Sequence, residues 1–286
     1  MPGNLWRTDD LTHRGFRQFY REWRPRHDSA QPMMALHGSL TQSGMWNAIA
    51  EGLGSVRMLC PDQRGFGRSE DPGDDTCATF AADATSLAQK LSLDRYAVMT
   101  HSFACAIALE VAIQAADRVT AVVLVDPVVR VGPAAQSAPS TSPPESFATI
   151  GEAMRHFRQT EEGKWTDLAL ARFVQDIMMR DADTGRWHFP YSAARLRRLR
   201  AFTASPASDY DLFAKAKALR CPLLIFRGGM SKRFPPEAEQ PFLEAFTAKP
   251  EIVVCPDSGH FPTATEPGIV IDALKRFANA SSRTAC

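Results

Sequence analysis

The amino-acid sequence predicts an α/β fold in which a mostly parallel, doubly wound sheet carries an inserted helical cap. Two observations predict it: short apolar runs alternate with helix-like stretches along most of the chain, and one long region interrupts that alternation. The apolar runs are bounded by Gly, Pro, Asp or Ser, as buried strands usually are. They cover residues 33–36, 56–60, 96–99, 119–125, 223–226 and 252–255.

The helix-like stretches fill the intervals between these runs. They cover residues 46–52, 77–91, 104–115, 236–247 and 267–279. Strands that alternate with helices form parallel sheets whose two faces are both covered, so each predicted strand is expected to be buried on both sides.

The interruption lies between residues 132 and 213. Residues 132–144 are rich in Pro, Ser and Ala and predict a connector, whereas residues 145–213 have helical character. We therefore expect a core formed by residues 1–131 and 214–286, with a helical cap at residues 132–213. The arginine-rich run 195–200 is interpreted as a solvated helix face in preference to a patch that attracts substrate.

Composition narrows the choice of partners. The 286 residues include 33 basic and 32 acidic side chains, and this formal charge of +1 argues against a nucleic-acid or membrane-surface partner. No apolar run approaches the roughly 20 residues that a bilayer span requires, and residues 1–26 contain no apolar signal segment. We expect a cytoplasmic protein that binds a small-molecule substrate. A homo-oligomer is compatible with the sequence.

The six cysteines are far apart in the chain, without a Cys-x-x-Cys pair or the Cys/His spacing of a zinc site. They predict buried free thiols, and we expect neither a metal nor another cofactor.

The segment Thr100-His101-Ser102-Phe103-Ala104 follows one predicted strand and precedes a predicted helix. This is the context of a nucleophile elbow, a sharp turn that lifts a serine hydroxyl above the edge of the sheet. The turn favours small residues two positions before and after the serine. Ala104 meets this demand, whereas Thr100 is bulkier than the usual glycine. We predict that Ser102 is the nucleophile.

Two glycine-containing loops follow the first two core strands. His37-Gly38-Ser39 stands where a loop can direct backbone N–H groups at the nucleophile, and we predict an oxyanion hole made by the N–H groups of Ser39 and Phe103. The second loop, residues 62–69, reads D-x-R-G-x-G-x-S, and we interpret it as architectural because its glycines permit tight turns.

The base and the acid are expected after later strands. His260 follows the last core strand in Ser258-Gly259-His260, the position expected for the general base. The loop after strand 223–226 contains no carboxylate, and the alternatives are Glu237, Asp257 and Asp126. Since Asp126 ends strand 119–125 on the same carboxyl edge as Ser102, we predict that it orients His260.

Together these motifs make the chain resemble the α/β-hydrolase superfamily from residue 33 to residue 277. The acid at Asp126 and the loop Arg227-Gly228-x-x-Ser231-Lys232 resemble (E)-2-(acetamidomethylene)succinate hydrolase, and the segment Leu124-Val125-Asp126-Pro127 is similar to N-formylmaleamate deformylase. That resemblance implies cleavage of an amide in a small acidic substrate, with Arg227, Lys232 or a cap arginine such as Arg180 binding a carboxylate. His37 flanks the same site, where it is expected to anchor its loop and to border the substrate.

The predicted activity is hydrolysis of an amide or ester through a Ser102–His260–Asp126 triad and an acyl-enzyme, without a cofactor. Two alternatives stay open. The same fold serves cofactor-independent ring-cleaving dioxygenases, in which the His–Asp pair deprotonates the substrate. The second alternative is a non-catalytic ligand-binding protein on a hydrolase scaffold. Oxygen consumption would indicate the dioxygenase, and the absence of ester turnover would indicate the binding protein.

Overall fold

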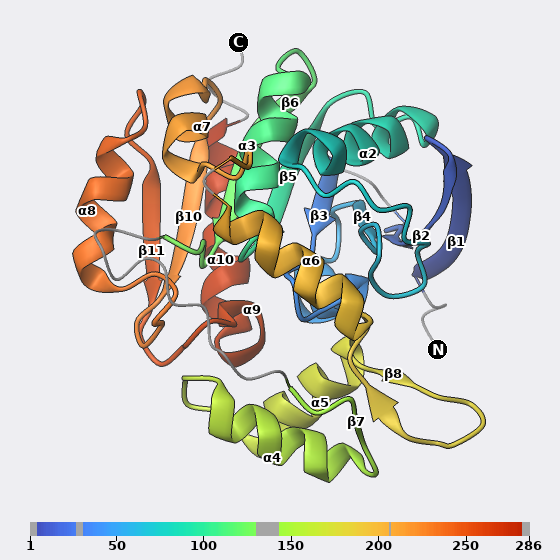
Figure 1. The fold of residues 1–286 in the computed structure, drawn as a ribbon. Helices are drawn as coiled ribbons and strands as arrows, with labels where there is room; N and C mark the ends of the chain where they lie inside the picture. The colour runs from blue at the N-terminus through green and yellow to red at the C-terminus, as the bar shows by residue number, and fades with distance from the viewer. Residues whose placement is uncertain (1–4, 27–30, 130–142, 206, 282–286) are drawn as a thin grey trace.

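The computed structural model describes residues 5–129, 143–205 and 207–281, apart from residues 27–30. Its centre is a sheet of eight strands in the order β1-β2-β4-β3-β5-β6-β10-β11 (Figure 1). The strands from β4 to β11 in this order are parallel, whereas β2 is antiparallel to both of its neighbours. This sheet confirms the predicted fold class. The strands span Trp6–His13 (β1), Phe16–Trp23 (β2), Met33–Leu36 (β3), Met58–Pro61 (β4), Tyr96–His101 (β5), Val119–Val125 (β6), Leu223–Gly228 (β10) and Glu251–Cys255 (β11).

The hairpin of β1 and β2 is the part of the sheet that the sequence did not predict. β1 lies at the sheet edge and exposes most of its side chains, so it lacks the apolar run that identifies a buried strand. The turn between the strands places Arg14 and Gly15 at positive φ, 48° and 82°, as a tight two-residue hairpin turn requires.

Helices cover both faces of the sheet, as expected for a doubly wound core. Along β6, Val122 and Leu124 belong to one apolar cluster, whereas Val123 and Val125 belong to the other. Each such buried side chain stabilises the fold by about 1.5–3 kcal/mol. One face carries α2 (Cys77–Lys90), α3 (Ala104–Gln114), α7 (Leu212–Ala218) and α8 (Pro236–Glu244). The other face carries η1 (Ser43–Trp46), α1 (Asn47–Leu53) and α10 (Pro267–Ser281), with the short α9 (Pro262–Thr265) beside them.

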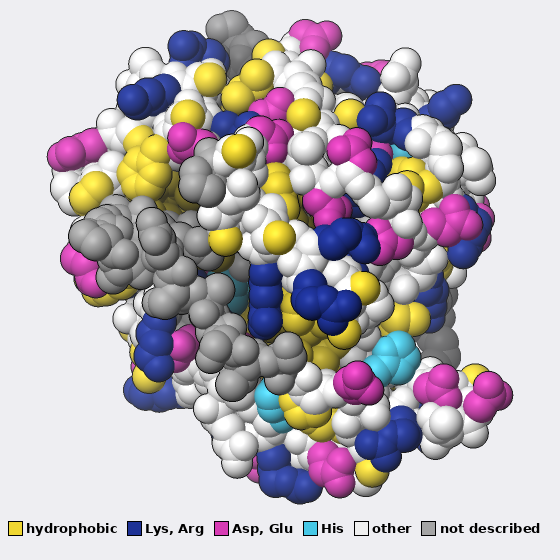
Figure 2. All heavy atoms as spheres, in the orientation of Figure 1, with side chains coloured by type: hydrophobic (Ala, Val, Ile, Leu, Met, Phe, Trp, Pro, Cys, Tyr) yellow, Lys and Arg dark blue, Asp and Glu magenta, His cyan; other side chains and the backbone are white. Residues whose placement is uncertain are grey.

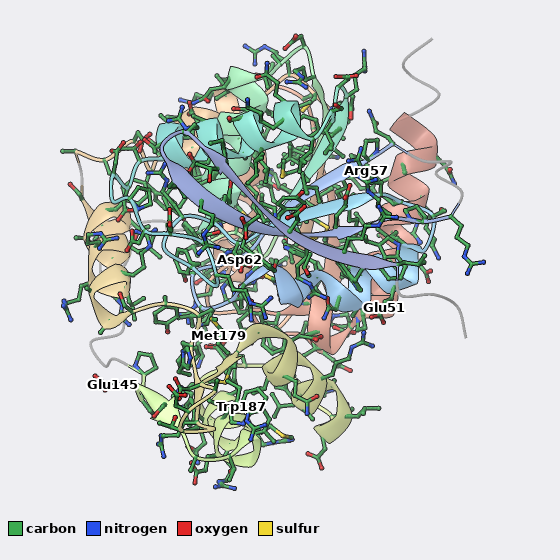
Figure 3. All side chains as sticks on the ribbon, turned by 90° about the vertical axis from the view of Figure 1, so that its right-hand side faces the viewer. Glu51, Arg57, Asp62, Glu145, Met179 and Trp187 are labelled. Carbon is green, nitrogen blue, oxygen red and sulfur yellow. The ribbon has the colours of Figure 1, made fainter. Side chains whose placement is uncertain are left out.

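The segment between β6 and β10 contains α4 (Ile150–Thr160), α5 (Asp167–Ile177) and α6 (Ala193–Ala204) before α7. It also contains a small antiparallel sheet of β7 (Ser146–Phe147), β9 (Trp187–His188) and β8 (Met179–Arg180), which the helical prediction missed. Two-residue strands leave no period that a sequence reading could detect. Figure 3 shows Met179 and Trp187 in this unit below Asp62 of the core. The predicted connector lies mostly outside the described residues, and the cap boundaries at residues 132 and 213 stay a prediction.

The arginine-rich run on α6 is only partly a solvated face. Arg195 is fully buried, forms an ion pair with Asp75, and places its guanidinium 4.8 Å from the ring centroid of Phe66. Arg197 and Arg198, in contrast, are exposed. The prediction was wrong for Arg195 because helical periodicity turns that position toward the core.

Four of the cysteines are buried free thiols, and Cys221 is a half-buried one. Cys286 lies outside the described residues. Within the described ranges, no helix combines the length and the apolar character that a bilayer crossing requires.

Candidate active site

Ser102 lies at the sharp turn between β5 and α3. Its φ of 60° falls in the left-handed region, which a non-glycine residue adopts only where the surrounding structure enforces it. The N–H of Ser102 donates to the carbonyl of Val125 at 3.0 Å, and its carbonyl accepts from the N–H of Cys105 at 3.0 Å. The turn therefore forms although Thr100, buried two positions earlier, is larger than glycine.

His260 brings the candidate nucleophile and the candidate acid together. Its Nε2 lies 2.8 Å from the Oγ of Ser102, and its Nδ1 lies 2.6 Å from Oδ2 of Asp126. Since an ionised carboxylate only accepts hydrogen bonds, the ring proton is assigned to Nδ1 and Nε2 is free to accept from the serine. This is the arrangement of a general base oriented by an acid.

Asp126 is held by the loop that follows β10. Its backbone N–H donates to the carbonyl of Phe226 at 2.8 Å, which aligns the end of β6 with β10. Oδ1 accepts from the N–H of Gly228 at 2.9 Å, and Oδ2 accepts from the hydroxyl of Ser231 at 2.5 Å. The loop without a carboxylate thus supplies donors to an acid that stands one strand away. Ser231 was part of the sequence motif, but its role was not foreseen.

Burial is the largest cause of the pKa shifts of both His260 and Asp126. It lowers the pKa of His260 well below the ordinary value of 6.5, with the positive charge of Arg233 as the second cause. Burial also raises the pKa of Asp126, whereas the hydrogen bonds from Ser231 and Gly228 lower it. At neutral pH the imidazole of His260 is therefore uncharged and keeps a lone pair on Nε2 toward Ser102.

His101 supports the loop that carries His260. Its Nε2 donates to the carbonyl of His260 at 2.7 Å, and the two ring centroids are 4.6 Å apart. Burial and then the neighbouring His260 lower the pKa of His101 to about 3, so it stays neutral. Gly259 permits a further close approach, because a Cβ there would lie 2.2 Å from the carbonyl oxygen of Glu162. Packing against Glu162 thus requires a glycine at position 259.

The predicted oxyanion loop lies against the nucleophile. A Cβ on Gly38 would be 3.3 Å from Cβ of Ser102 and 2.4 Å from Nδ1 of His101. Within the described residues, the backbone N–H groups of Ser39 and Phe103 donate to no protein group. Two free donors beside a serine can stabilise negative charge on a substrate oxygen.

His37 is committed to that loop. Its Nε2 accepts from the N–H of Gln63 at 2.9 Å, and its Nδ1 donates to the carbonyl of Gly38 at 2.8 Å. Both ring nitrogens are therefore occupied, which matches loop anchoring and leaves no nitrogen to contact a substrate. The loop after β4 is similarly architectural, since the carboxylate of Asp62 accepts from the backbone N–H groups of Ser43 and Arg68.

The three cations expected to bind a substrate carboxylate are engaged elsewhere. Arg227 donates to Glu239 at 2.7 Å. The ammonium of Lys232 lies 3.5 Å from Glu162, with 80% of its side chain exposed. Arg180 is exposed, donates to the carbonyl of Gly185 and lies over the ring of Trp187. Each of the three cations therefore already has a protein partner in the structure.

Two charged residues near His260 were not identified from the sequence. Arg233 is half-buried, and its guanidinium has no hydrogen-bond or ion-pair partner among the described residues. Glu161 is 9% exposed, and its Oε2 has no hydrogen-bond partner within the described ranges. The sequence shows two adjacent cations, Lys232 and Arg233. Only the structure shows that, among the described residues, Lys232 has an ion-pair partner and Arg233 has none. In the described ranges, no three His, Cys, Asp or Glu side chains converge as metal ligands would.

Comparisons with known proteins identify the family of the chain. The model of the Alpha/beta hydrolase family matches residues 34–273. The chain is 28% identical to N-formylmaleamate deformylase of Pseudomonas putida over 237 residues, which cover 77% of this chain and 79% of the relative. It is 25% identical to 3-hydroxybutyrate-oligomer hydrolase of Cupriavidus necator over 281 residues, 92% of this chain and 94% of the relative.

Among solved structures, that of E-2-(acetamidomethylene)succinate hydrolase superposes with a TM-score of 0.71 at 18% identity, covering 96% of this chain and 99% of the other. This likeness shows a shared fold. With the family model matching most of its length, the chain belongs to the alpha/beta hydrolase family and is a hydrolase.

Proposed function

We propose that this protein is a serine hydrolase that cleaves an amide or ester bond of a small molecule through an acyl-enzyme. One observation carries the proposal: an unbroken chain of hydrogen bonds runs from Oγ of Ser102 through His260 to Asp126, with lengths of 2.8 and 2.6 Å. The left-handed φ of Ser102 presents its hydroxyl at the carboxyl edge of the sheet, where a substrate can reach it.

The reaction follows from this arrangement. Oγ of Ser102 attacks the substrate carbonyl carbon while Nε2 of His260 takes its proton, and the carbonyl oxygen becomes negative beside the N–H groups of Ser39 and Phe103. His260 then protonates the leaving amine or alcohol as the C–N or C–O bond breaks. Water attacks the acyl-enzyme with the same base, which returns its proton to Ser102 as the acid product leaves. Asp126 holds the tautomer and stabilises the transient imidazolium.

The choice of amide or ester as the target bond draws on both relatives. The Pseudomonas putida protein is named a deformylase, and the Cupriavidus necator protein is named an oligomer hydrolase. The triad and the oxyanion donors act on the carbonyl carbon, which amides and esters share, so the same machinery serves either leaving group.

The test is labelling with a serine-reactive fluorophosphonate, measured as adduct mass on the intact protein, together with turnover of p-nitrophenyl butyrate. We expect one adduct in the wild type and none in Ser102→Ala. Ser55→Ala is the matched control, because Ser55 is exposed before β4, at the opposite edge of the sheet from Ser102. A folded wild-type protein with no adduct and no turnover would overturn the proposal. Oxygen consumption with a hydroxyquinolone, without turnover of the ester, would favour the dioxygenase alternative.

A further inference from the structure

The loop between α4 and α5, residues 161–166, lies against the loop of the general base, residues 256–261. Gly163 of this α4–α5 loop pairs with Ser258 of the base loop in an antiparallel β-bridge. Gly163 has a φ of 115°, and a Cβ there would lie 2.7 Å from the backbone nitrogen of Gly259. The two loops therefore approach each other backbone to backbone, which only a glycine at position 163 permits.

The residue that follows the base also contacts the inserted helices. The buried ring of Phe261 has its centroid 4.7 Å from that of Phe173 on α5 and 6.3 Å from that of Trp165. It also lies 5.0 Å from the ring of His101, whose Nε2 donates to the carbonyl of His260. Both chain neighbours of the base are thus in contact with the segment that contains α4 and α5.

Ion pairs at the surface contribute less to this junction. Lys164 lies 2.7 Å from Asp257, and Lys232 lies 3.5 Å from Glu162, but both lysine side chains are exposed. Exposed ion pairs add little to stability. The backbone pairing, in which the N–H of Lys164 donates to the carbonyl of Asp257 at 2.8 Å, and the burial of Phe261 therefore determine where the two loops meet.

We propose that the inserted helices position the general base. Gly163 and Phe173 hold the two chain neighbours of His260, so the alignment of its Nε2 with Ser102 depends on where the α4–α5 loop lies. This inference rests on the proposed serine hydrolase function and adds a means by which the inserted helices control it. Gly163 and Phe173 are positioning residues, because they act through the neighbours of His260 and not on the substrate. A displacement of about 1 Å in such a group can cost about 100-fold in rate.

The same arrangement links the base to the surface of the protein. Figure 1 shows α4 and α5 below the core, and α5 packs on α9, which begins two residues after His260. In Figure 2 a hollow with hydrophobic side chains at its bottom lies between α6 and α4. A ligand in this hollow meets α4, which leads directly into the α4–α5 loop, so binding there acts on an element that aligns the base.

The experiment compares Gly163→Ala with Gly151→Ala on α4. Both add one methyl group to the inserted helices, but the nearest atom to a Cβ on Gly151 is 3.8 Å away. In Gly163→Ala the added Cβ and the φ of 115° force the α4–α5 loop away from the base loop. We expect kcat for p-nitrophenyl butyrate to fall about tenfold to 100-fold with KM nearly unchanged, and fluorophosphonate labelling to slow in proportion. Gly151→Ala should match the wild type in both measurements.

Two readouts separate a displaced base from a loss of folded protein. Labelling of Gly163→Ala should be slow but reach one adduct per chain, whereas an unfolded fraction would leave chains unlabelled. In proton NMR, the Nδ1–H of His260, hydrogen-bonded to Asp126, resonates downfield of the amide protons and is identified by its loss in His260→Gln. This resonance should broaden or disappear in Gly163→Ala and persist in Gly151→Ala.

Phe173→Leu tests the second contact, and it carries the test by itself if Gly163→Ala does not fold. It removes the ring beside Phe261, and we again expect slow but complete labelling. Phe157→Leu is the matched control, because Phe157 is similarly buried and packs its ring on Phe173 and Phe189. It should be labelled at the wild-type rate.

Labelling at the wild-type rate in Gly163→Ala and Phe173→Leu, or slow labelling that stops below one adduct per chain, would overturn the inference. An unchanged His260 resonance in Gly163→Ala would also overturn it. A wild type that gives neither adduct nor ester turnover overturns the hydrolase proposal instead, so the failures of the two proposals are distinguishable.

Discussion

Ser231 and His260 donate to the same oxygen of Asp126: the serine hydroxyl lies 2.5 Å from Oδ2, and Nδ1 of the histidine lies 2.6 Å from it. The hydroxyl therefore fixes the carboxylate that orients the base. We predict that Ser231→Ala lowers kcat about tenfold or more with little change in KM, because a hydrogen bond to a charged group is worth about 1.5–3 kcal/mol. Steady-state kinetics measure this, and Ser231→Thr, which keeps the hydroxyl, should recover part of kcat. A kcat of Ser231→Ala equal to that of the wild type would contradict this role and show that the N–H of Gly228 is sufficient to hold Asp126.

Asp126→Asn is expected to reduce kcat by about 10³- to 10⁴-fold, because an amide no longer holds the His260 tautomer that accepts the serine proton. Fluorophosphonate labelling of Ser102 should slow in parallel. Asp257→Asn is the control. Asp257 lies close to His260 in the sequence, but its carboxylate accepts a hydrogen bond from the exposed Lys164. Loss of activity in Asp257→Asn and not in Asp126→Asn would assign the acid to Asp257.

The pH profile follows from the lowered pKa of His260. The base acts in its neutral form, and its folded pKa lies below 6.5, so activity should be retained at neutral pH and fall only as the pH drops well below 6.5. Asp126, His101 and Arg233 are the charged or titratable groups that contact His260 or act on it.

Removing one of these charges should move the profile in a known direction. Arg233→Gln eliminates a positive charge that disfavours the imidazolium, so the acid limb of kcat/KM should shift to higher pH. The measurement is kcat/KM for p-nitrophenyl butyrate against pH in both proteins. A shift to lower pH would contradict the placement of Arg233 near His260.

Gly38→Ala should disrupt the oxyanion loop. The new Cβ would stand 2.4 Å from Nδ1 of His101 and 3.3 Å from Cβ of Ser102, so the loop must move away from the nucleophile. We expect kcat to fall about 10²- to 10³-fold, as for loss of an oxyanion donor. Gly268→Ala, where nothing lies within 4 Å of the added atom, should leave kcat and Tm near the wild-type values.

Arg195 and Arg198 on α6 provide a test of stability. Arg195→Ala leaves Asp75 buried without its main partner and should lower the free energy of unfolding by about 3–5 kcal/mol. Arg198→Ala removes an exposed ion pair with Asp71 and a longer one, at 3.4 Å, with Asp75, which keeps its pair with Arg195, so the loss should be about 1 kcal/mol or less. Denaturant unfolding of both variants measures the difference, and equal losses would contradict the contrast in burial.

Local patterns in the sequence were sufficient to predict the parallel core and the positions of Ser102, His260 and Asp126. The central strands β4, β3, β5, β6 and β10 are buried on both faces and therefore consist of almost continuous apolar runs, whereas the predicted strand β11 lies at the sheet edge and is mostly exposed or half-buried. Parallel strands place their carboxyl ends on one edge, so residues that follow β5, β6 and β11 were expected to meet. The edge strand β1 escaped prediction because only one strand pairs with it and water surrounds most of its side chains.

Partnerships between residues far apart in the chain were decided only by the tertiary structure. The sequence shows three cations at the end of β10 and in the loop after it. Their acidic partners come from α8 and from the loop after α4. The sequence therefore could not show that, among the described residues, Arg233 alone of the three has no ion-pair partner. Nor could it show that Ser231 supports Asp126 from 105 positions away, or that Arg195 is buried. Apolar periodicity reports burial along one element, whereas hydrogen bonds and ion pairs depend on which elements the fold brings side by side.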